Sequence, residues 1–156
     1  MGTIKVYLDL DGVLADFDQH HFNVFGVRPC KTADNVDWAA VRAIPNFYLN
    51  IPPMPDMWEL FVGVQKMTGQ TPTVLTGVPY SVAEAPSNKI GWVEKYLGAH
   101  VPVITCQSKD KATFAKPGDV LVDDWDKYKS RWEQAGGVFI VHRNAAESLD
   151  ALAKVL

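Results

Sequence analysis

Short apolar runs alternate with longer amphipathic stretches along most of the chain. The apolar runs are rich in Val, Ile and Leu and are bounded by Gly, Pro or Asp, which is typical of buried strands. They are Ile4–Leu10, Thr71–Leu75, Val101–Thr105, Val120–Val122 and Val138–Val141. Between them, apolar residues recur every three or four positions, which predicts amphipathic helices. These are Asp56–Met67, Ser87–Leu97, Asp126–Gln134 and Ala146–Val155.

The alternation of strands and helices predicts an α/β fold. We expect a central parallel sheet of about five strands, covered by helices on both faces in a three-layer sandwich. Ligands of such sheets bind outside the carboxyl ends of the strands. Asp9, Thr76 and the pair Asp123-Asp124 all fall near the ends of predicted strands. The sequence therefore predicts a functional site at this edge of the sheet.

The segment 17–55 breaks the alternation. It is rich in aromatic residues and contains five prolines. We interpret it as a small, mostly helical cap inserted after the first strand. The length of 156 residues otherwise suits a single domain over residues 1–156 with a sizeable core.

Composition narrows the class of protein. The hydrophobic fraction is 47%, the charged fraction 21% and the net charge −3, so no basic tract predicts a stable nucleic-acid partner. No apolar run reaches the length of a membrane span. Cys30 and Cys106 have no CxxC spacing, which favours reduced thiols. These features favour a cytoplasmic protein, and leave both a monomer and a homodimer open.

Two carboxylates follow the first predicted strand. Asp9 and Asp11 are two residues apart, so on an extended chain their side chains share a face. Neighbouring carboxylates repel each other, and the pair needs a cation or a shared proton. One carboxylate could then attack an electrophile while the other handles a proton. Taken alone, however, Asp-Gly is more often a turn.

Three further motifs follow in the chain. They are Val74-Leu75-Thr76-Gly77, then Lys109-Asp110-Lys111, then Gly118–Asp124 with its terminal carboxylate pair. Each has a structural alternative. Thr76 is also an ordinary strand-end residue, a lone lysine is usually a solvated surface charge, and Asp123-Asp124 could cap the next helix.

In their order and placement, the four motifs resemble those of the haloacid dehalogenase-like superfamily of phosphohydrolases. Within it, four stretches are similar to the 5'(3')-deoxyribonucleotidases: Asp9–Phe17, Asn46–Pro55, Trp92–Gly98 and Asp119–Asp124. The resemblance implies a haloacid dehalogenase-like Rossmannoid fold. It also implies a Mg²⁺-dependent phosphomonoesterase, whose substrate is a small phosphomonoester such as a (deoxy)nucleoside monophosphate.

The resemblance implies roles for four catalytic residues. Asp9 would attack phosphorus and form an aspartyl-phosphate. Asp11 would protonate the leaving oxygen and then activate water. Thr76 and the backbone after it would bind the phosphoryl oxygens, and Lys111 would pair with their charge. Three other lysines are alternatives to Lys111: Lys89, Lys109 and Lys116.

The resemblance also implies a metal site. The Asp9 carboxylate, the Asp11 backbone carbonyl and Asp124 would hold Mg²⁺, and Asp123 would orient these groups. Such an oxygen-rich set of ligands, completed by phosphate, suits a hard cation.

Five residues are expected to contact the substrate: Phe17, Phe47, Trp38, Gly77 and Lys109. The aromatic residues would lie against the base, although aromatic residues at helical spacing are also typical of a core. Two of the five depart from the deoxyribonucleotidase pattern. Gly77 stands where those enzymes often carry Ser, and Lys109 stands where they often carry Arg, which alone forms a bidentate fork.

These departures and the short cap leave two alternatives open. One is a phosphatase of the same superfamily acting on another small phosphometabolite or on a nucleic-acid terminal phosphate. The other is a nucleotide-binding module without turnover, although no catalytic carboxylate is missing from the sequence.

Overall fold

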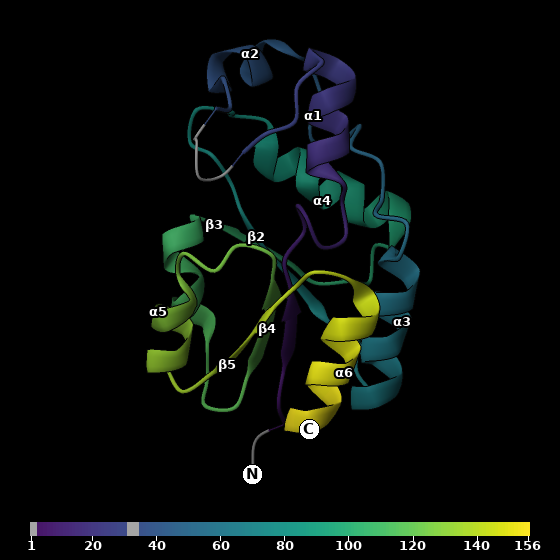
Figure 1. Cartoon of the computed structure of the whole chain (residues 1–156), viewed down its shortest axis with the longest axis vertical. Coiled ribbons are helices and arrows are strands. Elements are labelled where there is room, and N and C mark those ends of the chain that lie inside the picture. Colours follow the sequence, from purple (N-terminus) through teal and green to yellow (C-terminus); the bar gives the residue numbers. More distant parts are fainter. Residues whose placement is uncertain (1–2, 31–34) are drawn as a thin grey trace.

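The computed structural model describes residues 3–30 and 35–156, and its centre is a five-stranded parallel sheet (Figure 1). The strand order is β3-β2-β1-β4-β5. The strands are β1 (Val6–Leu8), β2 (Thr73–Gly77), β3 (Val103–Cys106), β4 (Val120–Asp123) and β5 (Val138–Val141). The first strand of the chain therefore lies in the middle, paired with β2 on one side and with β4 on the other.

The strands are apolar because both faces of the sheet are covered. Val6 and Leu8 belong to the larger core cluster, whereas Tyr7, on the opposite face, belongs to a second cluster with Trp132. The two clusters give three layers, as the sequence predicted.

Helices complete the outer layers. Residues of α3 (Met57–Thr68), α4 (Ala85–Tyr96) and α6 (Ala145–Val155) pack in the larger cluster. On the other face lie α5 (Lys129–Gln134) and the 3₁₀ helix η1 (Ser108–Phe114). None of the helices in the described part of the chain is long and apolar enough to cross a membrane.

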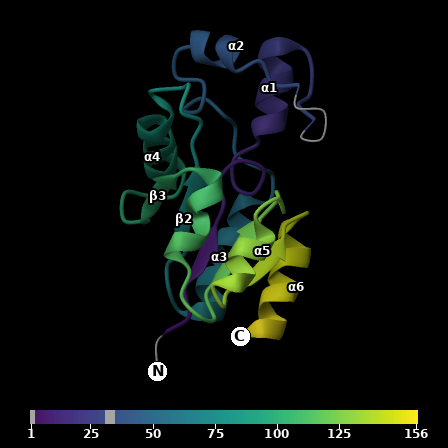
Figure 2. The same cartoon turned by 90° about the vertical axis from the view of Figure 1, so that its left-hand side faces the viewer.

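The segment between β1 and α3 carries α1 (Phe17–Phe25) and α2 (Trp38–Ala43). Both helices lie at the end of the molecule away from the two termini, beyond the carboxyl ends of the strands (Figures 1 and 2). The chain leaves and re-enters at one place, because the Asp16 amide donates to the Pro52 carbonyl and the Met54 amide donates to the Leu14 carbonyl. These two hydrogen bonds hold together the ends of the segment 17–55, whose role as a cap remains a prediction.

Side-chain caps fix where several helices begin. The carboxylates of Asp16 and Asp37 accept hydrogen bonds from backbone amides in the first turns of α1 and α2. Asp56 precedes α3 but does not cap it; its carboxylate accepts instead from the amide of Ala145 at the start of α6. Asp56 thereby links two helices of the same layer.

The structure differs from the predicted elements mainly at their ends. The strand predicted over Ile4–Leu10 is reduced to Val6–Leu8, because Leu10 accepts three turn amides instead of pairing in the sheet. The helix predicted from Asp126 begins at Lys129. The 3₁₀ helix η1 was not predicted, since its seven residues show no helical apolar spacing.

Candidate functional site

A sharp turn after β1 presents the first pair of carboxylates. The Asp9 amide donates to the Val122 carbonyl of β4, which continues the pairing one residue beyond the strand. Gly12 has a φ of 83°, in the left-handed region that favours glycine. A Cβ at this position would overlap the Asp124 carboxylate. The turn therefore brings the ends of β1 and β4 together only because residue 12 has no side chain.

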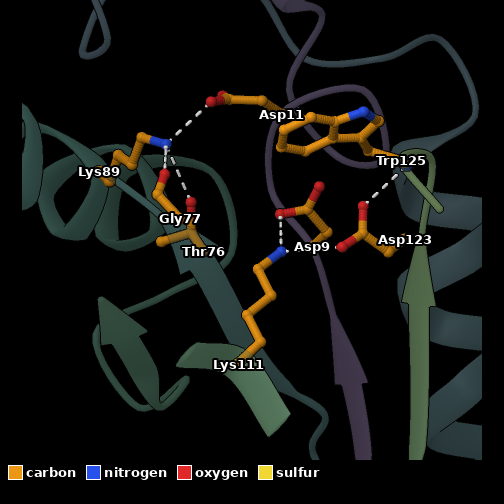
Figure 3. A network of polar contacts seen from close by, with 8 residues as sticks. All are labelled: Asp9, Asp11, Thr76, Gly77, Lys89, Lys111, Asp123 and Trp125. Atoms are coloured by element: carbon orange, nitrogen blue, oxygen red, sulfur yellow. Dashed lines mark hydrogen bonds and ion pairs between the residues drawn. The ribbon is translucent and has the colours of Figure 1, made fainter. Parts of the chain in front are cut away.

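Lys111 forms the centre of the first polar cluster. Its ammonium donates to Asp9 Oδ1 and to Asp123 Oδ2, at 2.9 Å each (Figure 3). All three side chains are almost fully buried. Asp123 is further held by the Trp125 amide, which donates to its Oδ1 at 3.0 Å. Among the candidate lysines, the structure thus brings Lys111 into contact with the expected nucleophile.

Lys89 forms the centre of a second cluster. It reaches the site from α4, and its ammonium donates to Asp11 Oδ2 at 2.8 Å, Thr76 Oγ1 at 3.0 Å and the Gly77 carbonyl at 2.7 Å (Figure 3). The ammonium also lies 4.7 Å from the centre of the Tyr48 ring, a cation–π contact. Lys89 is only 1% exposed.

The pKa values of Asp9 and Asp11 are shifted in opposite directions. Burial would raise the pKa of Asp9, but the charge and hydrogen bond of Lys111 hold that pKa below its ordinary value. Burial raises the pKa of Asp11, and Lys89 offsets only part of the increase. Burial and the Asp9 charge raise the pKa of Asp123 to about 8. Asp9 is therefore the most readily ionised of the three.

Three carboxylates could bind a cation together. Asp9, Asp123 and Asp124 each offer an oxygen, and these oxygens lie within 4.8 Å of one another. The side chain of Asp11 turns instead toward Lys89. Hard oxygen ligands in a largely buried setting fit a small divalent cation.

The carboxylates open into a cavity of about 290 Å³. The 17–55 segment contributes aromatic side chains to its wall, and the sheet edge contributes the charged groups. Of the aromatic residues predicted to contact substrate, Phe17 and Trp38 line it. Tyr48 and Trp125 also line it, and neither was singled out from the sequence.

Two of the predicted contacts do not reach the cavity. Phe47 is 1% exposed and packs behind Phe17, with ring centres 5.8 Å apart, so it belongs to the core. Lys109 is exposed, and its carbonyl accepts a hydrogen bond from Arg131. The three-residue turn of η1 explains this, because residues 108 and 111 share a face and residue 109 points elsewhere. Gly77, by contrast, lines the cavity.

Lys89 is the main residue that the sequence underrated. The sequence suggested Lys89 only as an alternative to Lys111, whereas both lysines lie in the site, Lys111 against Asp9 and Lys89 against Asp11. A possible signal is its place in the first half of a helix that follows the Thr76 strand. Thr76 itself is fully buried, as expected of a residue at the end of an inner strand.

Comparison with known proteins defines the fold class first. The structure resembles a hydrolase from Streptococcus pneumoniae TIGR4 with a TM-score of 0.52 and 11% identity, covering 97% of this chain and 99% of that one. L-2-haloacid dehalogenase from Xanthobacter autotrophicus gives a TM-score of 0.46 at 11% identity, covering 88% and 76%. The chain has the three-layer Rossmannoid α/β fold that its alternation of strands and helices predicted, and it shares this fold with the Streptococcus hydrolase.

Sequence comparison then identifies a more specific relative. The chain is 24% identical to the human cytosolic-type 5'(3')-deoxyribonucleotidase, over 84% of this chain and 75% of that protein. No family model matches the chain. The resemblance to deoxyribonucleotidases found in the motifs therefore extends over most of the sequence.

Proposed function

We propose that this chain is a Mg²⁺-dependent phosphomonoesterase that hydrolyses (deoxy)nucleoside monophosphates through an aspartyl-phosphate. The observation that carries the proposal is the convergence of Asp9, Asp11 and Lys111 on one cavity, with the Lys111 ammonium 2.9 Å from Asp9. There Lys111 lowers the pKa of Asp9 and burial raises the pKa of Asp11, directions that suit a nucleophile and a general acid respectively.

In the first step, an Asp9 oxygen forms a bond to phosphorus while the bond from phosphorus to the leaving oxygen breaks. Asp11 gives its proton to that leaving oxygen. In the second step, the ionised Asp11 takes a proton from water, whose oxygen attacks the same phosphorus. The bond to Asp9 then breaks and inorganic phosphate leaves, so both carboxyl groups return to their starting states.

The remaining groups neutralise and orient the phosphoryl oxygens. Lys111 is already 2.9 Å from Asp9, so its ammonium lies beside the point of attack. Thr76 is fully buried and does not line the cavity; its hydroxyl accepts from Lys89 and thereby holds that lysine in place. Such fixed donors act most strongly in a site largely shielded from water.

The carboxylates of Asp9, Asp123 and Asp124 would hold Mg²⁺, together with the backbone carbonyl of Asp11. Bound there, the ion supplies positive charge to the phosphoryl group and lessens its repulsion by Asp9. The donor set fits this ion, because every candidate ligand atom is oxygen.

A nucleotide is the substrate that the cavity supports best. Phe17 and Trp38 form an aromatic wall suited to a base, and the volume of about 290 Å³ suits a small molecule. The human relative is named as a deoxyribonucleotidase of the cytosolic type. We extend both the substrate class and a cytoplasmic location to this chain as parts of the proposal.

The test is phosphate release from a panel of phosphomonoesters, with Mg²⁺ and with EDTA. The panel contains nucleoside 5'- and 3'-monophosphates, sugar phosphates and a 3'-phosphorylated oligonucleotide. We expect nucleoside monophosphates to be hydrolysed in the presence of Mg²⁺ and not in the presence of EDTA. Turnover of a sugar phosphate without any nucleotide would refute the substrate, and no turnover at all would refute the enzyme.

A further inference from the structure

Gly77 lacks a side chain for a spatial reason. Its φ lies outside the left-handed region, so its backbone conformation is open to any residue. A Cβ at this position would overlap the Ser108 hydroxyl, and would lie 3.1 Å from Ser108 Cβ and 3.2 Å from Ser108 Cα. The space beside the Gly77 backbone is thus filled by Ser108.

Ser108 faces the cavity together with Lys111. It begins η1, and in a 3₁₀ helix side chains three residues apart lie one above the other. Ser108, Lys111 and Gly77 all line the cavity next to Asp9. The Ser108 hydroxyl therefore lies against the end of β2, in the wall of the cavity that Asp9 and Lys111 also line.

The Ser108 hydroxyl is also available to a ligand. Among residues 3–30 and 35–156 it makes no hydrogen bond, whereas the Thr76 hydroxyl accepts from Lys89. A half-buried hydroxyl that lines a polar cavity without a partner can donate to an anion bound there.

We propose that Ser108 is a substrate-binding residue, whose hydroxyl donates a hydrogen bond to a non-bridging oxygen of the bound phosphoryl group. Residue 77 must then be glycine, because the hydroxyl occupies the place of its side chain. This role rests on the proposed phosphomonoesterase function, and Ser108 lies outside the four sequence motifs. No proton moves from Ser108, which contributes a neutral donor to a charged acceptor.

The test uses two measurements on four variants. Hydrolysis of p-nitrophenyl phosphate reports turnover without any base, and calorimetric titration with inorganic phosphate in Mg²⁺ reports phosphoryl binding alone. Ser108→Ala should lower kcat/KM and phosphate affinity by about 10- to 100-fold, the range for a hydrogen bond to a charged group. Its thermal unfolding should be unchanged, because the hydroxyl has no partner within the protein.

The exchange of the two residues gives the sharper result. Gly77→Ser alone should impair both measurements, because the added side chain overlaps Ser108. The double variant Gly77→Ser/Ser108→Gly moves the hydroxyl from residue 108 to residue 77. Its kcat/KM should be higher than that of Gly77→Ser or of Ser108→Ala. Ser130→Ala, an exposed serine on α5, is the control and should equal the wild type.

Each outcome separates the two proposals. If the wild type turns over p-nitrophenyl phosphate and Ser108→Ala stays within twofold in both measurements, the role of Ser108 is refuted and the enzyme stands. If the wild type does not hydrolyse p-nitrophenyl phosphate, the proposed enzymatic function is refuted. The phosphate titration alone then tests the role of Ser108. Weaker binding by Ser108→Ala then supports the contact, whereas equal binding, or none by the wild type, overturns it.

Discussion

The two lysine clusters of the site use the same kind of side chain in different surroundings. Lys111 lies between two buried carboxylates, Asp9 and Asp123. Lys89 meets one carboxylate, a hydroxyl and a carbonyl, and its partner Asp11 has a side chain that is 27% exposed. The first lysine neutralises charge that cannot reach water, whereas the second mainly fixes the positions of neutral or partly hydrated groups.

The different surroundings of the two lysines show how carboxyl groups at one edge of the sheet come to have a lowered or a raised pKa. Beside Lys111, the pKa of Asp9 falls although the group is buried. Beside Lys89, the pKa of Asp11 rises, because burial outweighs the ion pair. A lysine contact alone therefore does not determine the ionisation of its partner; the balance with burial does.

The largest expected effect separates the two carboxylates by their roles. Asp9→Asn should lower turnover of every phosphomonoester by at least about 10⁴-fold, as the loss of a nucleophile does. Asp11→Asn should slow substrates with poor leaving groups by about 10²- to 10⁴-fold. With p-nitrophenyl phosphate, whose leaving group needs no proton, it should release one rapid equivalent of p-nitrophenol and then stall. Stopped-flow absorbance measures both phases.

The rapid phase is the control within this experiment, because the same variant must form the intermediate before it stalls. Loss of the rapid phase in Asp11→Asn would show that Asp11 does more than transfer protons. Residual turnover by Asp9→Asn above the stated limit would remove Asp9 as the nucleophile.

A second prediction compares the lysines through stability. Lys111→Met leaves the buried, ionised Asp9 carboxylate without its cation, which should lower the free energy of unfolding by about 3–5 kcal/mol. Lys89→Met leaves a partly hydrated carboxylate and two neutral groups, so about 1–3 kcal/mol is expected. Urea unfolding in EDTA measures both values.

The double variant Lys111→Met/Asp9→Asn is the matched control. It removes one negative charge together with the ammonium, and should recover part of the loss. A larger loss in the free energy of unfolding for Lys89→Met than for Lys111→Met would contradict the view that Lys111 neutralises the more deeply buried charge.

The smallest effect concerns protons released by metal. Because the pKa of Asp123 is raised to about 8, this group is mostly protonated at pH 7 in the metal-free protein. Mg²⁺ binding to the carboxylates favours the ionised form, so binding should release protons at pH 7 and weaken as the pH falls below 8. Calorimetry in two buffers of different ionisation enthalpy counts the protons.

Asp123→Asn cannot release this proton and should remove most of the buffer dependence. Mg²⁺ affinity that stays constant between pH 6 and pH 8 in the wild type would contradict the raised pKa.

Most of the fold could be predicted from the sequence, because buried parallel strands are nearly continuous apolar runs. Val138–Val141 agrees with its prediction at both ends. The first strand was predicted too long, since Leu10 is as apolar as its neighbours but is buried in a turn rather than in the sheet. Apolar pattern reports burial, and burial has more than one cause.

The site was predictable where residues follow strands, and less so where they lie on helices. Thr76 and Asp123 are placed by the parallel register itself, and Asp9 follows β1 by one residue, with its amide bonded to β4. Lys89 lies 78 residues from Asp11 in the sequence, on a helix whose rotation no local pattern reports. Phe47 was mistaken for a pocket residue because an aromatic side chain looks alike in a core and in a pocket.

The central place of β1 has a consequence for synthesis of the protein. Asp9 is synthesised early, and Lys111 is not synthesised until 102 residues later. The edge of β1 that pairs with β4 likewise has no partner until Val120–Asp123 have been synthesised. During this interval, a growing chain carries an apolar strand with an open edge, which can pair with another chain. Interrupted translation before β4 would therefore leave a fragment prone to aggregation, in which Asp9 is present but Lys111 is not yet beside it.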